Sequence, residues 1–192
     1  GVLIGFIMLG GIVVNNAINT SKDNSHVNLL ASDNISFADG VSITTSGIGG
    51  DVIIATDTDD TNGGAILGNG DITISTNEGD ITLGGGSNTG DDFTDGSGDD
   101  QTGVEIRGSA TLSSQGGDII IRGESTNGTD DSAGIIFGDA VDIQSGEGVI
   151  LIHGKNTNTN TNNTVDHGVS IASSQSILIK SLNTTNDAIT II

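Results

Sequence analysis

Acidic residues gather in two polar segments of the sequence, where their carboxylates could bind a divalent cation. They are Asp57, Asp59 and Asp60 in the first segment, and Asp91, Asp92, Asp95, Asp99 and Asp100 in the second. Carboxylate oxygens are preferred ligands of Ca²⁺, and a bound cation would relieve the repulsion between neighbouring negative charges. Neither segment is an EF-hand loop, because Phe93 stands where a ligand is required and a bidentate Glu is absent. We treat the eight residues as candidate Ca²⁺ ligands, with a solubilising acidic flank as the alternative.

A second set of aspartates occupies one fixed place in a repeated pattern. Asp51, Asp80 and Asp118 each follow a glycine and precede a run of aliphatic residues. An aspartate in such a position commonly accepts a hydrogen bond from the backbone of its own turn. We favour this structural role over a ladder of metal ligands.

The residue types needed for catalysis on polysaccharides are mostly missing. Such sites combine a pair of carboxylates with a base or nucleophile and with aromatic platforms, yet the chain has four Phe and no Tyr or Trp. Arg107 and Arg122 fall in a repeat that contains no histidine, and His26, His153 and His167 are isolated from one another in sequence. Without Cys or a helical His/Glu spacing, the histidines do not suggest zinc. We therefore assign no catalytic residue and expect no enzyme, with a polysaccharide-acting enzyme as the third alternative.

The charge of the chain excludes two classes of partner. It has 25 acidic and only 5 basic residues, for a formal net charge of −20. Nucleic acids and anionic lipids both require a clustered basic surface, so neither is expected as a partner. The apolar stretch Gly1–Val14 is too short for a spanning helix and lacks a positively charged start, so no membrane span is predicted.

Short aliphatic runs, bounded by Gly, repeat along the sequence in the same internal order. Residues 103–123 read GVEIRGSATLSSQGGDIIIRG and residues 134–154 read GIIFGDAVDIQSGEGVILIHG, and the two units align without a gap. Each unit contains three candidate strands, which in the first are Val104–Arg107, Ala110–Ser113 and Asp118–Arg122. Similar units begin at Gly64 and Gly168. Units with three strands in a fixed order indicate stacked coils.

The repeats predict an all-β fold, a right-handed parallel β-helix with three strands per coil and about five to six coils. Residues 27–192 would form this solenoid, with polar inserts near 57–63, 86–102, 124–133 and 155–167 that leave from one corner. Residues 1–26 would be a cap, a donated strand or the first coil. A β-sandwich is the structural rival, but it predicts antiparallel hairpins. Alternation places these residues inside: Val104, Ile106, Ala110, Leu112, Ile119, Ile121, Ile135, Phe137, Val141, Ile143, Ile150 and Ile152.

The order of motifs within the repeat resembles that of a known family. Units of the form G-x-x-I, A-x-[IL]-x-S and G-G-D-I-x-I-x-G, followed by an insert rich in Asn, Thr, Gly and Asp, are similar to those of filamentous haemagglutinin-type bacterial exoproteins. The resemblance covers residues 27–192. It implies a long right-handed β-helix that reaches the cell surface, commonly by two-partner secretion, and works as an adhesin or fibre shaft.

Both ends of the sequence are apolar, which is unusual for the edges of a solenoid. Such edges carry unpaired strands and exposed core, and they self-associate unless they are covered. We expect head-to-tail stacking of copies into a homo-oligomer or filament outside the cell. The alternative is a module that binds Ca²⁺ or surface glycans through its acidic, Asn/Thr-rich flank. The expected assembly residues are Val2, Leu3, Ile4, Phe6, Ile7, Leu9, Ile12, Val13, Ile189, Ile191 and Ile192.

Overall fold

The computed structural model describes residues 1–59, 63–86, 90, 92–96, 102–126, 132–157, 167–171, 175–184 and 187–192. The residues in these ranges form strands and turns and no helix. Within them there is accordingly no helix with the length and apolar character needed to cross a membrane.

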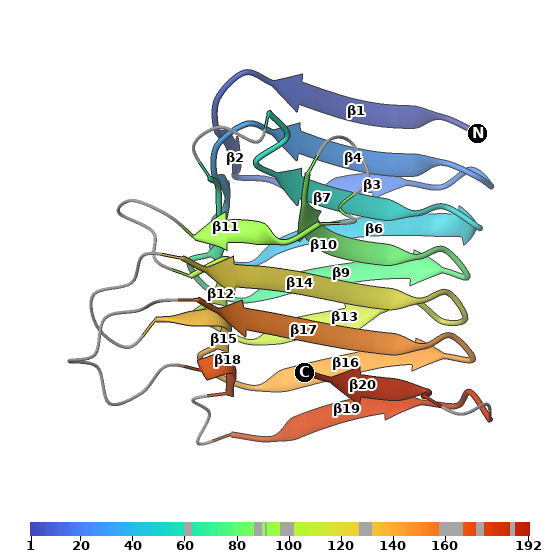
Figure 1. Ribbon diagram of the computed structural model, residues 1–192. Helices are drawn as coiled ribbons and strands as arrows, with labels where there is room; N and C mark the ends of the chain where they lie inside the picture. Colours follow the sequence, from blue (N-terminus) through green and yellow to red (C-terminus); the bar gives the residue numbers. More distant parts are fainter. Residues whose placement is uncertain are drawn as a thin grey trace.

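Three parallel sheets form the sides of the molecule (Figure 1). Sheet A contains β1 (Leu3–Met8), β4 (His26–Ala31), β7 (Val52–Thr56), β10 (Ile81–Gly85), β14 (Ile119–Ser125), β17 (Ile150–Asn156) and β20 (Ile189–Ile191), with β11 (Thr94–Gly96) beside β14. Sheet B contains β2 (Ile12–Val14), β5 (Ile35–Phe37), β8 (Ile66–Gly68), β12 (Val104–Ile106), β15 (Ala133–Phe137) and β18 (His167–Ile171). Sheet C contains β3 (Ile18–Thr20), β6 (Val41–Ile48), β9 (Ile72–Asn77), β13 (Ala110–Ser113), β16 (Val141–Gly146) and β19 (Ile177–Ser181).

The chain visits the sheets in the order A, B, C and then returns to A one layer further along. In the described residues this gives six complete coils, from β1–β3 to β17–β19, and β20 then starts another coil. Sheet A strands run from right to left at the front of Figure 1, sheet C strands run back behind them, and the chain descends from β1 to β20. The coil is therefore right-handed, as expected for parallel crossovers. The predicted three-stranded β-helix is confirmed, and the sandwich is excluded because every ladder between strands is parallel.

Equivalent residues of successive coils lie directly beside one another, so the core consists of continuous columns of side chains. In sheet B, Ile106 is paired with Gly68 on one side and with Phe137 on the other. All twelve residues that alternation placed inside are buried, with at most 1% of their surface exposed. Gly68 fits the pattern because a Cβ there would lie 3.3 Å from a methyl carbon of Ile106, in a space already filled by larger neighbours.

A column of hydroxyl groups lines the corner between sheets C and A. The buried Thr45, Thr76, Ser114 and Ser145 each donate from Oγ to a glycine carbonyl across the corner, at 2.5–2.6 Å. The accepting glycines are Gly50, Gly79, Gly117 and Gly148. These glycines also stack closely, because a Cβ at Gly117 would lie only 2.3 Å from the carbonyl oxygen of Gly79. Paired hydroxyls and close glycines therefore hold this corner in the same shape in each coil.

Polar inserts leave from a different corner, the one between sheets A and B. The segments near 57–63, 86–102, 124–133 and 155–167 all lie where the chain passes from a sheet A strand to the next sheet B strand. By contrast, only three residues separate β1 from β2, and three separate β4 from β5. Residues 1–26 contain β1, β2 and β3, which form the first coil of the stack.

Candidate functional site: the open ends of the solenoid

The described acidic residues of the inserts lie at the corner between sheets A and B, but they serve different structural roles. Asp57 and Asp59 follow β7, and Asp57 adopts a left-handed backbone conformation with φ of 53°. Asp92 accepts the amide of Phe93 at 2.8 Å through Oδ1, and Asp95 accepts the hydroxyl of Thr126 at 2.6 Å. The first bond fixes a local turn, and the second connects β11 to the end of β14.

The calcium prediction extends beyond the described part of the chain. Asp60, Asp91, Asp99 and Asp100 lie outside the described residues. Within the described ranges, no three His, Asp or Glu side chains converge in a way that could hold a metal ion. The eight-residue Ca²⁺ site therefore stays a prediction.

The aspartates of the repeated Gly-Asp motif connect one coil to the next. Oδ1 of Asp51 accepts the amide of Asp80 at 2.9 Å, and Oδ1 of Asp80 accepts the amide of Asp118 at 2.7 Å. Asp118 accepts from Val149 in the same way, at 2.9 Å. Each bond thus reaches the following coil, where the sequence had suggested a bond within the residue's own turn. The pKa of Asp80 is raised above its usual value. The largest cause is partial burial, and repulsion from Asp118 and Asp51 contributes less.

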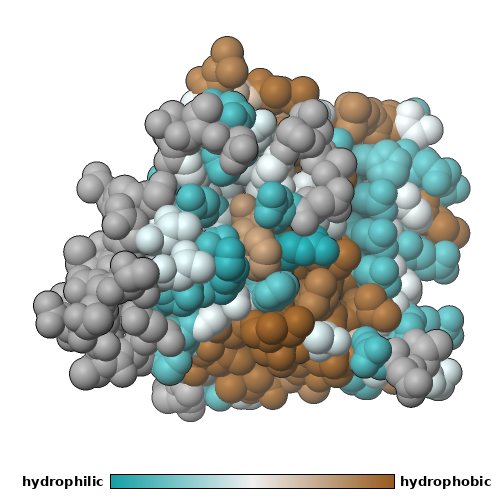
Figure 2. Space-filling view, in the orientation of Figure 1, coloured by the Kyte–Doolittle hydropathy of each residue, from teal (hydrophilic) through white to brown (hydrophobic). Residues whose placement is uncertain are grey.

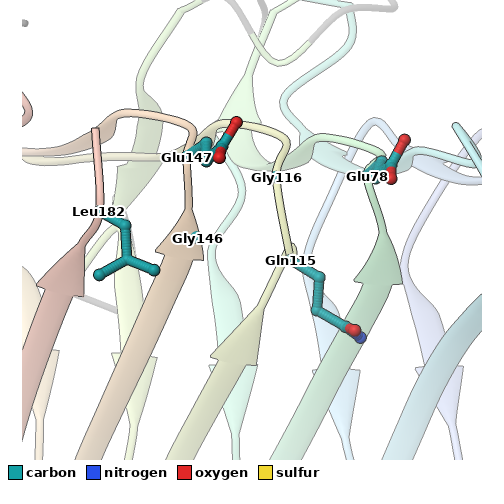
Figure 3. A pocket seen from close by; sticks show the side chains of 6 residues that line it. All are labelled: Glu78, Gln115, Gly116, Gly146, Glu147 and Leu182. Carbon is teal, nitrogen blue, oxygen red and sulfur yellow. The ribbon is translucent and has the colours of Figure 1, made fainter. Parts of the chain in front are cut away.

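A shallow groove of about 570 Å³ runs along the corner between sheets C and A (Figure 3). Its described lining includes Glu78, Gln115, Glu147 and Leu182. The two carboxylates belong to coils that are two layers apart, so their backbones are separated by roughly 10 Å at the usual spacing of strands. In Figure 3 both glutamates stand on the outer turns of the corner. No aromatic or basic side chain is among these described lining residues, so the groove offers a polar surface without the groups that grip a sugar ring.

The insert between β10 and β12 is held against sheet A by contacts that sequence reasoning missed. Phe93 meets the ring of His153 edge-on, with centroids 4.7 Å apart, and Lys155 Nζ lies 5.6 Å from the centroid of Phe93. Lys155 also forms an ion pair with Glu124, and Arg122 donates to the carbonyl of Gly90 at 3.2 Å. The feature of the sequence that could have indicated these contacts is Phe93, an isolated aromatic residue in a polar insert. These contacts tie the insert to the face of the solenoid.

The N-terminal end face is an open cross-section of the core. It is made by the inward-facing side chains of β1, β2 and β3, and a hollow of about 270 Å³ there is lined by Phe6, Ile12, Val14, Ile18 and Leu29, among others. Phe6 occupies a core position, because it pairs with the fully buried Leu29, yet 50% of its surface is exposed. Phe6 is exposed because β1 is the outermost strand of sheet A among the described residues.

The C-terminal end face is equally apolar. Ile177 and Ile189 continue core columns, yet they are 50% and 41% exposed. Figure 2 shows hydrophobic side chains gathered at the top, over β1, and at the bottom, around β17 and β20. Thirteen of the fourteen exposed large hydrophobic residues in the described ranges belong to the first coil or to the segment from residue 177 onward. They are Val2, Leu3, Phe6, Ile7, Met8, Leu9, Val13, Ile177, Leu178, Leu182, Ile189, Ile191 and Ile192.

The expected assembly residues belong to the first coil and to the segment from residue 177 onward, and their role in assembly stays a prediction. Nine of the eleven are exposed, whereas Ile4 and Ile12 are partly buried against the core. Sequence reasoning missed Met8, Ile177, Leu178 and Leu182. Ile177 and Leu178 lie in β19, whose sequence looks like that of an interior strand, so only its place at the end of the stack exposes them.

Comparison with known proteins adds no assignment to these faces. No protein-family model, no curated protein and no solved structure matches the chain. The resemblance of the repeat units to filamentous haemagglutinin-type exoproteins therefore remains a prediction from the sequence.

Charge is distributed along the solenoid axis in a way that sets the two ends apart. Residues 22–166 contain 24 of the 25 acidic residues and four of the five basic residues. The remaining charged residues are Lys180 and Asp187, which cancel, and residues 1–21 contain none. The whole formal charge of −20 thus belongs to the middle of the chain, and the apolar ends are electrically neutral.

Proposed function

We propose that this chain is a structural β-solenoid that lengthens by head-to-tail stacking, so that copies form the shaft of an extracellular or cell-surface fibre. The observation that carries the proposal is that the exposed large hydrophobic residues belong almost entirely to the first coil and to the segment from residue 177 onward, where inward positions such as Phe6, Ile177 and Ile189 are uncovered. The extracellular location rests on the resemblance of the repeats to bacterial exoproteins.

The physical basis is the burial of core cross-section. A core position at an end face gains apolar contact on its open side only when another coil stacks upon it. Completing the burial of a side chain the size of Phe6 contributes up to about 1.5–3 kcal/mol. The end coils carry less charge than the acidic middle, so the repulsion between copies is weaker when they meet end to end than when they lie side by side. Stacking along the axis is therefore favoured over lateral association.

Electron microscopy of two matched variants tests the proposal. Phe6→Asp puts a charge into the N-terminal end face, where stacking would bury it at high cost. Ile48→Asp makes the same kind of change at the last residue of β6, on the side of the solenoid, at a residue that is 52% exposed against 50% for Phe6. We expect fibres from the unmodified chain and from Ile48→Asp, and short particles from Phe6→Asp.

Circular dichroism of all three proteins verifies that each retains its β structure. Monodisperse single particles from the unmodified chain at every concentration would refute the proposal. Fibres of equal length from Phe6→Asp would show that the N-terminal end face takes no part in them.

A further inference from the structure

The outward side of sheet C carries a regular array of small hydroxyl side chains. Three strands, β6, β9 and β13, each place two such residues there, at alternate positions of the strand. Parallel pairing arranges the six residues in two columns, which are Ser42–Thr73–Thr111 and Thr44–Ser75–Ser113. These six residues are the hydroxyl face of the molecule.

Turns of equal length keep the hydroxyl face in register. Three residues separate β5 from β6, β8 from β9, and β12 from β13, so each coil enters sheet C through a turn of the same size. The strands of sheet C then run side by side in one direction (Figure 1). Neighbouring strands lie about 4.8 Å apart, and alternate residues of one strand lie about 6.6 Å apart. The hydroxyl groups therefore stand on a nearly rectangular grid.

The hydroxyls of this face are available to an external partner. Within the described part of the chain, none of the six forms a hydrogen bond, whereas the inward hydroxyls of Thr45, Thr76 and Ser114 donate to glycine carbonyls. Each hydroxyl can donate one hydrogen bond and accept two. The Thr side chains of the face are also stiff, because branching at Cβ restricts their χ1 angle. The face thus presents polar groups that are fixed in place and unpaired.

The charge around the hydroxyl face restricts what can lie on it. The six residues carry no charge, but aspartates line both margins of the sheet. Asp39 and Asp71 lie in the turns that enter sheet C, and Asp51, Asp80 and Asp118 lie in the turns that leave it. These margins repel anionic polymers, and they repel a second copy of this chain, whose formal charge is −20. The face therefore suits a neutral partner.

The shape of the hydroxyl face favours an extended surface over a small molecule. Small ligands are held in concave sites that enclose most of their area, and short side chains on the outside of a sheet enclose nothing. A single exposed hydroxyl binds weakly, because water competes for its hydrogen bonds. Many such bonds act together when the partner repeats with a similar spacing. The partner that fits is a solid with a lattice of its own.

We infer that the hydroxyl face binds ice. The surface of an ice crystal is neutral, presents rows of oxygen atoms that donate and accept hydrogen bonds, and repeats at distances similar to those of the grid. Crystalline neutral polysaccharides share this chemistry, but proteins hold sugar rings mainly with aromatic platforms, and none of the four Phe residues lies in sheet C. This inference goes beyond the proposed fibre and does not depend on it, since one copy contains the whole face.

Freezing measurements on two matched variants test the inference. Ser75→Lys puts a long charged side chain on the middle strand of the face, where it holds the neighbouring hydroxyls away from a flat crystal. Ser36→Lys makes the same change at the outward residue of β5 in sheet B, which is partly buried as Ser75 is. We expect the unmodified chain and Ser36→Lys to lower the freezing temperature below the melting temperature and to inhibit recrystallisation of ice. Ser75→Lys should lose both effects.

A conservative variant and a second solid complete the test. Ser75→Thr keeps the hydroxyl and should retain both effects, and circular dichroism verifies that every variant keeps its β structure. Absence of both effects from the unmodified chain, or equal effects from Ser75→Lys, would overturn the inference. Binding to microcrystalline cellulose that Ser75→Lys abolishes, without any effect on ice, would also overturn it and would assign the face to a neutral polysaccharide. These outcomes are the same whether or not the chain forms fibres.

Discussion

At the scale of single residues, aspartates at the corner between sheets C and A connect one coil to the next. Asp51, Asp80 and Asp118 each accept an amide of the next coil, whereas the stacked hydroxyls of the same corner, such as that of Ser114, donate to glycine carbonyls. Carboxylates stacked in adjacent layers stabilise the turn by hydrogen bonding and destabilise it by mutual repulsion. The balance of these two effects can be measured at Asp80.

Asp80→Asn should stabilise the fold at neutral pH. An Asn side chain keeps the Oδ1 acceptor for the amide of Asp118 but removes the repulsion from Asp51 and Asp118 that helps to raise the pKa of Asp80. We expect the free energy of unfolding to rise by about 0.5 kcal/mol, the size typical of exposed charge pairs, and the gain to shrink with added salt. Chemical denaturation of both proteins at low and high ionic strength measures this difference.

The pH dependence of the same pair of proteins has a definite sign. Because the pKa of Asp80 is higher in the folded than in the unfolded chain, the folded state binds the proton first as the pH falls. This residue therefore adds stability as the pH is lowered from neutral through its folded pKa, and the advantage of Asp80→Asn should disappear over the same range. An advantage that persists at acid pH, or a loss of stability at neutral pH, would contradict this account. Asp80→Ala, which removes the acceptor as well, serves as the control and should not stabilise.

At the scale of strands, residues alternate between facing the core and facing outward, and this alternation determines which substitutions the fold can tolerate. Ile106 of β12 is fully buried between Gly68 and Phe137, whereas Glu105 beside it points outward and pairs with Arg107. Ile106→Ala should cost about 2–5 kcal/mol, because the column on either side cannot collapse into the cavity. Glu105→Ala, one residue away, should cost no more than about 1 kcal/mol. Equilibrium unfolding of the two variants measures both values, and similar costs would mean that the strand does not alternate as described.

The strands of the central coils could be predicted from the sequence, because runs of alternating apolar and polar residues, separated by Gly-rich corners, repeat there without a gap. The units at 103–123 and 134–154 match β12–β14 and β15–β17 to within about three residues at each strand end. The short strand β11 could not be found in this way. It pairs with Gly123–Ser125 of β14 after a polar excursion, and its sequence, Thr94–Gly96, has no aliphatic residue. Its position depends on contacts such as that of Phe93 with His153, which join residues far apart in the chain.

The candidate assembly faces were only partly predictable, for a related reason. The apolar first coil is visible as the run Gly1–Val14, but Ile177 and Leu178 have the same pattern as interior strands. Exposure at an end is a property of the stack and not of the local sequence. The position of β20 beyond the last complete coil likewise becomes apparent only when all coils are placed in register.

At the scale of the whole molecule, a neutral apolar end and a strongly acidic middle predict how fibres respond to pH. The formal charge of −20 at neutral pH keeps neighbouring shafts apart at low salt, where the Debye length exceeds about 10 Å. Near the isoelectric point of about 4.1 that repulsion vanishes, while the end faces, which lack net charge, are unaffected. Lowering the pH to this value in low salt should therefore widen fibres into bundles without shortening them. Fibre width and length in electron micrographs at both pH values measure the two effects separately. Shortening at acid pH would mean that ionised groups contribute to the joint, since aliphatic contacts between coils do not titrate.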